Sequence, residues 1–196
     1  MRVDLSKIKS AVNYNASDDS GVRSLHAHSS TELIGEPFQK LKLFIGEISR
    51  TKDIHFVTWG KWSMPDLLFY ILKQTGPAHL LISTWSIAND AMEKLILRYR
   101  KKEVLSCSFL LDPRVRARDP KPLQLAERNF TCRLVACHAK VTVLWNQEWK
   151  LTIYGSANFT YNPRIERGII SPNKNVFNFD KNWINDAINR GPDNRH

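Results

Sequence analysis

One stretch of thirty residues, Cys137 to Glu166, constrains the fold of this chain more than any other. It opens on a predicted strand over residues 134–145, where most side chains are β-branched, aromatic or apolar. Side chains on a strand alternate between the two faces of the sheet, so His138 and Lys140 are expected to project side by side. A turn and a returning strand over residues 149–154 follow. The pattern therefore predicts a hairpin with an imidazole and an amine on one face.

A small polar turn, Gly155-Ser156-Ala157-Asn158, follows the returning strand. Such a turn can bring a backbone N–H, a hydroxyl and a carboxamide close to a bound anion. Glu166 stands at the start of an apolar run over residues 165–170. The stretch thus supplies the donors, the cation and the carboxylate that phosphate chemistry uses.

These residues resemble the signature of the phospholipase D superfamily, a His-x-Lys strand followed by a Gly-Ser-x-Asn turn. His138-Ala139-Lys140 matches the first half and the Gly155–Asn158 turn the second. Glu166 falls where the small bacterial nucleases of this superfamily carry an acidic residue. The resemblance implies an α/β fold, a mixed β-sheet flanked by helices, with one signature per chain. The sequence departs from the family at Trp145, where an Asp is usual; the tyrosyl-DNA phosphodiesterases also lack this Asp.

The residue types suit phosphodiester cleavage, which needs a nucleophile, a cationic clamp and an acid for the leaving group. His138 can attack phosphorus and form a covalent phosphohistidine. Lys140 can neutralise the phosphoryl oxygens, to which Ser156 and Asn158 can donate hydrogen bonds. Glu166 can hold the imidazole in a productive orientation. Because fixed cations and donors perform the electrostatic role, no metal and no cofactor are expected.

The single His-x-Lys has a consequence for assembly, because one imidazole cannot comfortably be both nucleophile and leaving-group acid. Superfamily members with two signatures bring both into one site, and members with one signature form a two-fold dimer that does the same. We therefore expect a homodimer with the active site on its two-fold axis, where one His138 attacks and the other donates the proton.

The chain carries 29 Lys and Arg against 19 Asp and Glu, a net charge of +10. Such an excess attracts polyanions, either nucleic acid or an anionic membrane surface, although it also serves solubility. Four of the cations lie in the proline-rich segment PRVRARDPKP, which is expected to be a loop. That loop either contacts a nucleic-acid backbone or is simply solvated. The four residues are Arg114, Arg116, Arg118 and Lys121.

Three tryptophans, Trp59, Trp62 and Trp85, lie near predicted strand ends. Indole rings at such positions can stack on bases, but core packing is their commoner role. His26 and His28 invite a metal site, but they have no Cys or acidic companion and are interpreted as inert.

The 196 residues, 42% of them hydrophobic, fit one domain with a sizeable core. We expect a flexible or partner-packing arm over residues 1–34, a phospholipase D-like domain over 35–190 and a disordered tail over 191–196. No apolar run is long enough to span a membrane, and the N-terminus lacks the apolar core of a secretory signal, which favours the cytoplasm. The three cysteines are expected to be reduced thiols.

Outside the signature, the apolar periodicity predicts strands alternating with helices, as in an α/β fold. A capping box at Ser63 and Asp66 predicts a helix start, and Ser86 or Asn89 can cap another. Helices are expected over residues 37–49, 63–74 and 89–102, with a short one near 183–188, and strands over 54–59, 79–84 and 104–112.

The function that these features favour is a metal-independent phosphodiesterase acting on nucleic acid, that is, a nuclease. A His and a Lys two positions apart are often incidental, but the Gly155–Asn158 turn and Glu166 make phosphate chemistry the stronger interpretation. One alternative is a phospholipase or phosphatidyltransferase of the same superfamily. Another is a catalytically inactive dimer that binds nucleic acid.

Overall fold

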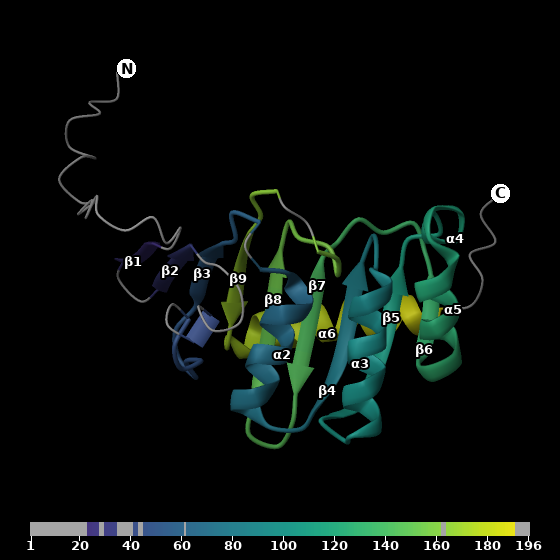
Figure 1. The fold of residues 1–196 in the computed structure, drawn as a ribbon. Coiled ribbons are helices and arrows are strands. Elements are labelled where there is room, and N and C mark those ends of the chain that lie inside the picture. Colours follow the sequence, from purple (N-terminus) through teal and green to yellow (C-terminus); the bar gives the residue numbers. More distant parts are fainter. Residues whose placement is uncertain are drawn as a thin grey trace, which may run out of the picture.

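The computed structural model describes residues 23–27, 30–34, 41–42, 45–60, 62–161 and 164–190, with the backbone alone for residues 23–34. Within this part of the chain, the strands form one nine-stranded sheet in the order β1-β2-β3-β9-β8-β7-β4-β5-β6 (Figure 1). The strands are β1 (Arg23–Ala27), β2 (Ser30–Ile34), β3 (Ile54–Val57), β4 (Ala78–Thr84), β5 (Val104–Leu111), β6 (Thr131–Leu134), β7 (Val141–Trp145), β8 (Lys150–Gly155) and β9 (Arg167–Ser171). The helices are α2 (Met64–Thr75), α3 (Asn89–Arg100), α4 (Val115–Arg118), α5 (Pro120–Asn129) and α6 (Lys174–Asn189).

The sheet is mixed. Strands β4, β5 and β6 are parallel to one another, whereas β7, β8 and β9 follow as antiparallel neighbours. Helices α2, α3 and α5 cover one face and α6 covers the other (Figure 1). This confirms the predicted α/β fold with a mixed sheet flanked by helices.

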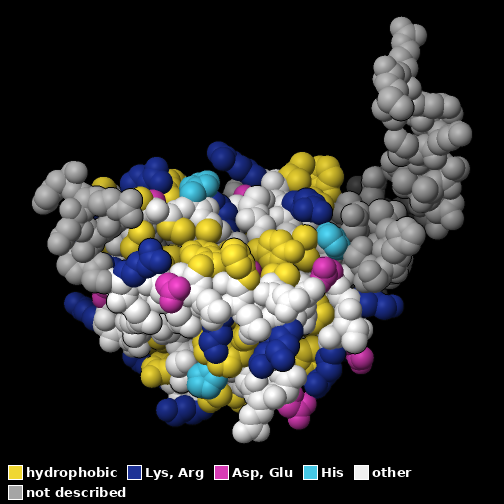
Figure 2. Space-filling view, turned by 180° about the vertical axis from the view of Figure 1, so that it is seen from behind, with side chains coloured by type: hydrophobic (Ala, Val, Ile, Leu, Met, Phe, Trp, Pro, Cys, Tyr) yellow, Lys and Arg dark blue, Asp and Glu magenta, His cyan; other side chains and the backbone are white. Residues whose placement is uncertain are grey.

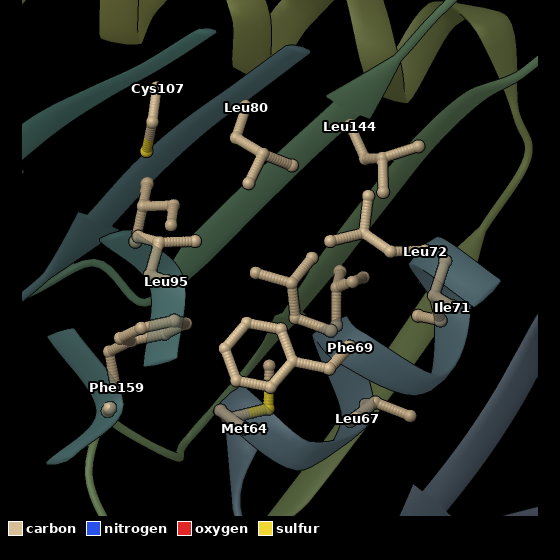
Figure 3. Close-up of a cluster of buried hydrophobic side chains, with 14 of the residues drawn as sticks. Met64, Leu67, Phe69, Ile71, Leu72, Leu80, Leu95, Cys107, Leu144 and Phe159 are labelled. Carbon is tan, nitrogen blue, oxygen red and sulfur yellow. The ribbon is translucent and has the colours of Figure 1, made fainter. Parts of the chain in front are cut away.

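Two hydrophobic clusters hold the helices to the sheet. The larger one packs Leu67 and Ile71 of α2 and Leu95 of α3 on Leu80 of β4 and Leu144 of β7, all at most 1% exposed (Figure 3). Burying each such side chain stabilises the fold by about 1.5–3 kcal/mol. The smaller cluster joins α6 to the other face through Phe177 and Ile184. Seen from the α6 side, hydrophobic side chains form a band across the molecule, with Lys and Arg around it (Figure 2).

Local sequence sets one helix start and tertiary contacts set the next. The capping box is confirmed, since Ser63 accepts from the backbone of Asp66 and the Asp66 carboxylate accepts from the backbone of Ser63. The predicted caps of the following helix are wrong: its N-cap is Ala88, which makes no side-chain bond. The backbone N–H of Ala88 donates instead to the carbonyl oxygen of Phe159 over 3.1 Å, and this long-range contact fixes where α3 begins.

The predicted strand over residues 134–145 is wrong in its first half. Strand β6 ends at Leu134 on the sheet edge beside β5, whereas β7 begins at Val141 beside β4. The chain must therefore cross the ends of β5 and β4 between these residues, and a crossing segment cannot continue as a strand. His138 and Lys140 lie in this crossing, so strand alternation does not place them.

The Arg-rich segment is helical, where the sequence predicts a loop. It forms the short helix α4 and the start of α5, and Pro120 is the first residue of α5. Proline is tolerated there because the first-turn N–H groups have no partner inside the helix. The closing helix α6 is longer than predicted and is capped by the side chain of Asn173.

Other predictions also need correction or fall outside the described chain. Of the helix predicted over residues 37–49, residues 41–42 are helical and 45–50 are a turn and bends. Within the segment 1–34, β1 and β2 lie at one edge of the sheet, where β2 pairs in parallel with β3; that this segment is a flexible or partner-packing arm stays a prediction. His28 and the predicted tail over 191–196 lie outside the described residues.

Candidate active site

The two halves of the signature meet at one edge of the sheet, where β4, β5 and β8 end and β7 and β9 begin. This is the upper edge in Figure 1. His138 and Lys140 reach it in the crossing before β7, and Ser156 reaches it directly after β8. The hairpin of β7 and β8 therefore carries both halves to one place.

His138 and Lys140 lie in contact. The Lys140 Nζ is 3.3 Å from each ring nitrogen of His138 and donates to the His138 carbonyl oxygen over 2.9 Å. The imidazole is exposed and the lysine is half-buried. Burial lowers the pKa of Lys140, and the carboxylate of Glu166 raises it in part. An accessible imidazole thus has a partly desolvated amine beside it.

Gly155 joins the two halves through the backbone. Its N–H donates to the Lys140 carbonyl oxygen over 3.3 Å, one step beyond the last pair of β7 and β8, Val141 with Tyr154. A side chain does not fit here, because a Cβ on Gly155 would lie 2.2 Å from the Arg167 carbonyl oxygen. The glycine lets β8 and β9 approach closely at the site.

Ser156 and Glu166 form a hydrogen-bonded pair across the same edge. The Ser156 hydroxyl donates to the Glu166 carboxylate and accepts from the Arg167 N–H over 3.1 Å. Glu166 is also fixed through its backbone, since its N–H donates to the Thr58 hydroxyl over 3.2 Å. The sequence assigns Glu166 to the His138 imidazole, whereas in the structure the Glu166 carboxylate accepts a hydrogen bond from Ser156.

Asn158 is placed by β4. The Thr84 hydroxyl donates to the Asn158 side-chain oxygen over 3.4 Å and accepts from the Phe159 N–H over 3.1 Å. Sequence reasoning did not assign Thr58 or Thr84 to the site. Their signal is a pair of hydroxyl groups at the ends of apolar strands, and both residues are 2% exposed.

Two further residues at the end of β4 support the crossing that carries His138. The Ser83 hydroxyl donates to the Ala139 carbonyl oxygen over 3.2 Å. The indole of Trp85 meets the His138 ring edge to face, with centroids 6.0 Å apart at 62°. Ser83, Thr84 and Trp85, which are consecutive at the end of β4, thus contact the Ala139 carbonyl, the Asn158 side chain and the His138 ring respectively.

The four predicted backbone-binding cations differ in their surroundings. Arg114 makes two hydrogen bonds to the buried carboxylate of Asp112, at 2.6 and 2.9 Å, and these bonds lower the pKa of Asp112 to about 2. The guanidinium groups of Arg114 and Arg118 lie over Trp85, 5.3 and 4.8 Å from its ring centroid. Arg116 is exposed on α4. Lys121 lies farther along the chain, 3.7 Å from Glu93 of α3.

The three tryptophans that lie near predicted strand ends also differ in their surroundings. Trp62 is 2% exposed and packs on Phe56, so it belongs to the core. Trp59 follows β3, is 48% exposed and has a φ of +48°, a conformation that is rare for a large side chain. Trp85 is partly buried beside His138.

Trp145, where the family usually has an Asp, lies at the opposite end of β7 from Lys140. Five residues of strand separate the two positions by about 16 Å. Its indole stacks on His79 at 5.4 Å and lies under the Lys181 amine at 4.3 Å. The substitution therefore changes packing at the far edge and removes no group from the site.

Among the residues that the structure describes, no group of three or more His, Cys, Asp or Glu is placed to hold a metal ion. None of the helices in the described ranges combines the length and the apolar character that crossing a bilayer requires.

No protein-family model and no curated protein matches this sequence. Solved structures are similar to it, and two are compared below. NucT from Helicobacter pylori superposes with a TM-score of 0.54 at 11% identity, over 70% of this chain and 95% of its own. A polyphosphate kinase from Porphyromonas gingivalis superposes with a TM-score of 0.54 at 12% identity, over 74% of this chain and 27% of its own. The likeness at these identities is one of fold, and the fold of this chain is phospholipase D-like.

Proposed function

We propose that the chain is a metal-independent phosphodiesterase that cleaves nucleic acid. One observation carries the proposal: the backbone bond from Gly155 to Lys140 brings an exposed imidazole, an amine and the Ser156–Glu166 pair to one sheet edge. If the His-x-Lys pattern were incidental, we would not expect it to lie beside the hydrogen-bonded Ser156 and Glu166 at the same sheet edge.

In the proposed reaction an imidazole nitrogen of His138 bonds to phosphorus while the bond from phosphorus to the leaving oxygen breaks. Lys140 neutralises the non-bridging oxygens, to which Asn158 donates, and Ser156 donates to them once its hydroxyl turns from the Glu166 carboxylate to the phosphate. The lowered pKa of Lys140 reflects a desolvated setting, in which its charge acts more strongly on a phosphoryl group than in water. Water then attacks the phosphohistidine and the nitrogen–phosphorus bond breaks.

The leaving oxygen needs a proton, which we assign to His138 of a second copy in a homodimer. That imidazole gives its proton to the leaving group and takes one from the attacking water, so the cycle closes. The exposure of His138 supports this arrangement, because a second chain can approach the ring. The Glu166 carboxylate accepts from Ser156, and its negative charge favours the protonated form of Lys140.

Nucleic acid is the preferred substrate because of the charge. The chain carries +10, and Arg114 and Arg118 lie over the indole that contacts His138. A polyanion is attracted both by the net charge and by these two guanidinium groups, whereas a lipid headgroup offers a single phosphodiester.

The test is a panel of end-labelled DNA, end-labelled RNA and a fluorescent phospholipid, each incubated with the protein in EDTA. We expect cleavage of nucleic acid, and a loss of about 10³-fold or more for His138→Asn. His79→Asn is the matched control, since His79 lies at the opposite sheet edge beside Trp145. Cleavage of the phospholipid alone would assign the site to lipid chemistry. Nucleic-acid binding without cleavage would support an inactive binding dimer instead.

The dimer is tested by mixing wild-type chains with His138→Asn chains, unfolding them together and refolding them. If each active site needs two imidazoles, equal amounts leave about one quarter of the activity. If one chain suffices, about one half remains. Light scattering on the same samples gives the mass of the particle, and a monomer with full activity would exclude the shared site.

A further inference from the structure

We propose that Arg118, held over the indole of Trp85, binds a second phosphate of a polynucleotide, within a few positions of the one attacked by His138. The inference rests on the proposed function and names what distinguishes a polymeric substrate from a single phosphodiester. It comes from the position of Trp85, which the proposed chemistry does not use.

Trp85 connects the Arg-rich helix to the imidazole. It directly follows Thr84, the last residue of β4. Its ring meets the His138 ring edge to face, with the two ring centroids 6.0 Å apart. The Arg118 guanidinium lies over the same indole at 4.8 Å. The Trp85 Nε1 is buried and has no acceptor among the described residues, so ring and cation contacts set its position.

The two arginines on this indole are not equivalent. Arg114 is bonded through Nε and Nη2 to the buried Asp112, which neutralises its charge and fixes its orientation. Arg118 is exposed, and no carboxylate in the described part of the chain lies within ion-pair distance of it. Arg118 is therefore the cation on Trp85 whose donors remain for a ligand. A guanidinium that lies over a ring still has N–H groups that do not face the ring, and a phosphate can accept from them.

The distance between Arg118 and His138 suits two phosphates of one strand. The contacts through Trp85 place the Arg118 guanidinium no more than about 11 Å from the imidazole, a few phosphates along a strand at about 3.4 Å of axis each. A small diester bound at His138 has no second phosphate to offer Arg118. A polynucleotide has one.

The matched control is Arg116, an exposed arginine two positions away on the same short helix, for which no contact with Trp85 is seen. Arg118→Ala and Arg116→Ala remove the same charge from the same element. Their difference therefore isolates the contact on the indole from the general field of the protein.

The first measurement compares two substrates, a labelled single-stranded 20-mer and bis(p-nitrophenyl) phosphate. Arg118→Ala is expected to raise KM for the 20-mer about tenfold, and to change kcat/KM for the small diester by less than about twofold. Arg116→Ala is expected to change both by less than about twofold. Equal effects of the two variants on the 20-mer would overturn the proposal. An equal loss on both substrates for Arg118→Ala would also overturn it, since the residue would then act through the position of His138.

The second measurement does not depend on catalysis. In a His138→Asn background, fluorescence anisotropy gives Kd for the labelled 20-mer across a range of salt concentrations. Adding Arg118→Ala should weaken binding about tenfold and reduce the slope of log Kd against log salt by about one, as expected for one lost phosphate contact. An unchanged slope would overturn the second-phosphate site. If the wild type cleaves neither substrate, the proposed function is wrong. The anisotropy measurement still tests whether Arg118 binds a phosphate of the 20-mer.

The third measurement tests Trp85. If the indole acts by holding Arg118, Trp85→Ala and Arg118→Ala are not additive in Kd, and the double variant binds no worse than about twofold below the weaker single variant. Additive losses would show that the two residues act separately. Thermal unfolding of each variant separates this result from loss of the fold.

Discussion

The backbone N–H of Gly155 donates to the carbonyl oxygen of Lys140, and this single bond joins the two halves of the candidate site. It continues the β7–β8 ladder by one residue past its last strand pair. The turn that carries Ser156 and the segment that carries His138 thus leave the sheet side by side.

Gly155→Ala should destabilise the protein by about 2 kcal/mol or more, because the new Cβ would lie 2.2 Å from the Arg167 carbonyl oxygen and backbone has to move. Urea unfolding measures the change. Gly46→Ala is the control: Gly46 has open space where a Cβ would lie, so alanine there meets only the backbone strain of its φ of +59°, about 1 kcal/mol. Equal costs at the two positions would contradict the close approach of β8 and β9.

Glu166→Gln should lower the pKa of Lys140 further. Burial already lowers this pKa and the Glu166 charge opposes the effect, so removing that charge leaves burial with less opposition. The glutamine oxygen can still accept from Ser156. A ¹³C NMR titration of the lysine Cε signals, with Lys140→Arg to assign the resonance, gives the direction. Glu148→Gln, which changes a carboxylate paired with Arg50, is the control and should leave the Lys140 pKa where it was.

Asp112→Asn should lower the Tm at neutral pH by several degrees, and the difference should shrink in acid. The bonds from Arg114 lower the pKa of Asp112 to about 2, below its value of about 3.9 in an unfolded chain. The ionised carboxylate therefore stabilises the fold above about pH 4, and this contribution is lost as the pH falls from 4 to 2. Scanning calorimetry across this range measures the loss. Asp119→Asn, on the same segment, controls for removal of one negative charge, and a constant Tm difference down to pH 2 would contradict the assignment.

Cys137 should react with iodoacetamide well before the other two cysteines. Burial raises the pKa of Cys132 to about 12 and raises that of Cys107 well above its ordinary value, so little thiolate forms at either position. Cys132 and Cys137 are both half-buried, so the raised pKa of Cys132 is what distinguishes the two; the Cys137 Sγ lies 3.4 Å from the Ser83 hydroxyl. Peptide mass spectrometry after timed labelling at pH 8 gives the order of reaction. Labelling in urea should make the three rates similar, and early labelling of Cys132 in the folded protein would contradict the structure.

Trp145→Asp, which introduces the residue usual in the phospholipase D superfamily, should not raise activity. The position lies at the far end of β7, and the indole contacts His79, Phe177 and Lys181 there. Losing these contacts should cost about 2 kcal/mol or more in urea unfolding. Trp145→Phe, which keeps a ring, should cost less. A gain in phosphodiesterase rate for the aspartate variant would show that this end of the strand communicates with the site.

Local patterns predicted the elements whose ends depend on nearby residues. The Ser63–Asp66 box marks the start of α2 because both partners lie within one turn. The start of α3 at Ala88 depends on Phe159, about seventy residues away, and no local signal reports that contact. The break between β6 and β7 is of the same kind, because it follows from which strands they pair with.

The candidate site divides in the same way. The motif predicted His138, Lys140, Ser156, Asn158 and Glu166, and the fold brings their segments to one edge. The supporting hydroxyls of Thr58 and Thr84 were missed, since their importance depends on which strand ends lie beside the Ser156 turn. Among the predicted cations, only the structure distinguishes Arg118 from Arg114 and Arg116.

Ser83, Thr84 and Trp85 make β4 the strand whose register the chemistry depends on. A slip of one position along β5 and β7 would exchange the sides on which the two hydroxyls emerge. The crossing and the Asn158 turn would then lose their anchors together. Insertions that a loop elsewhere would tolerate should therefore be fatal to activity when they fall inside this strand.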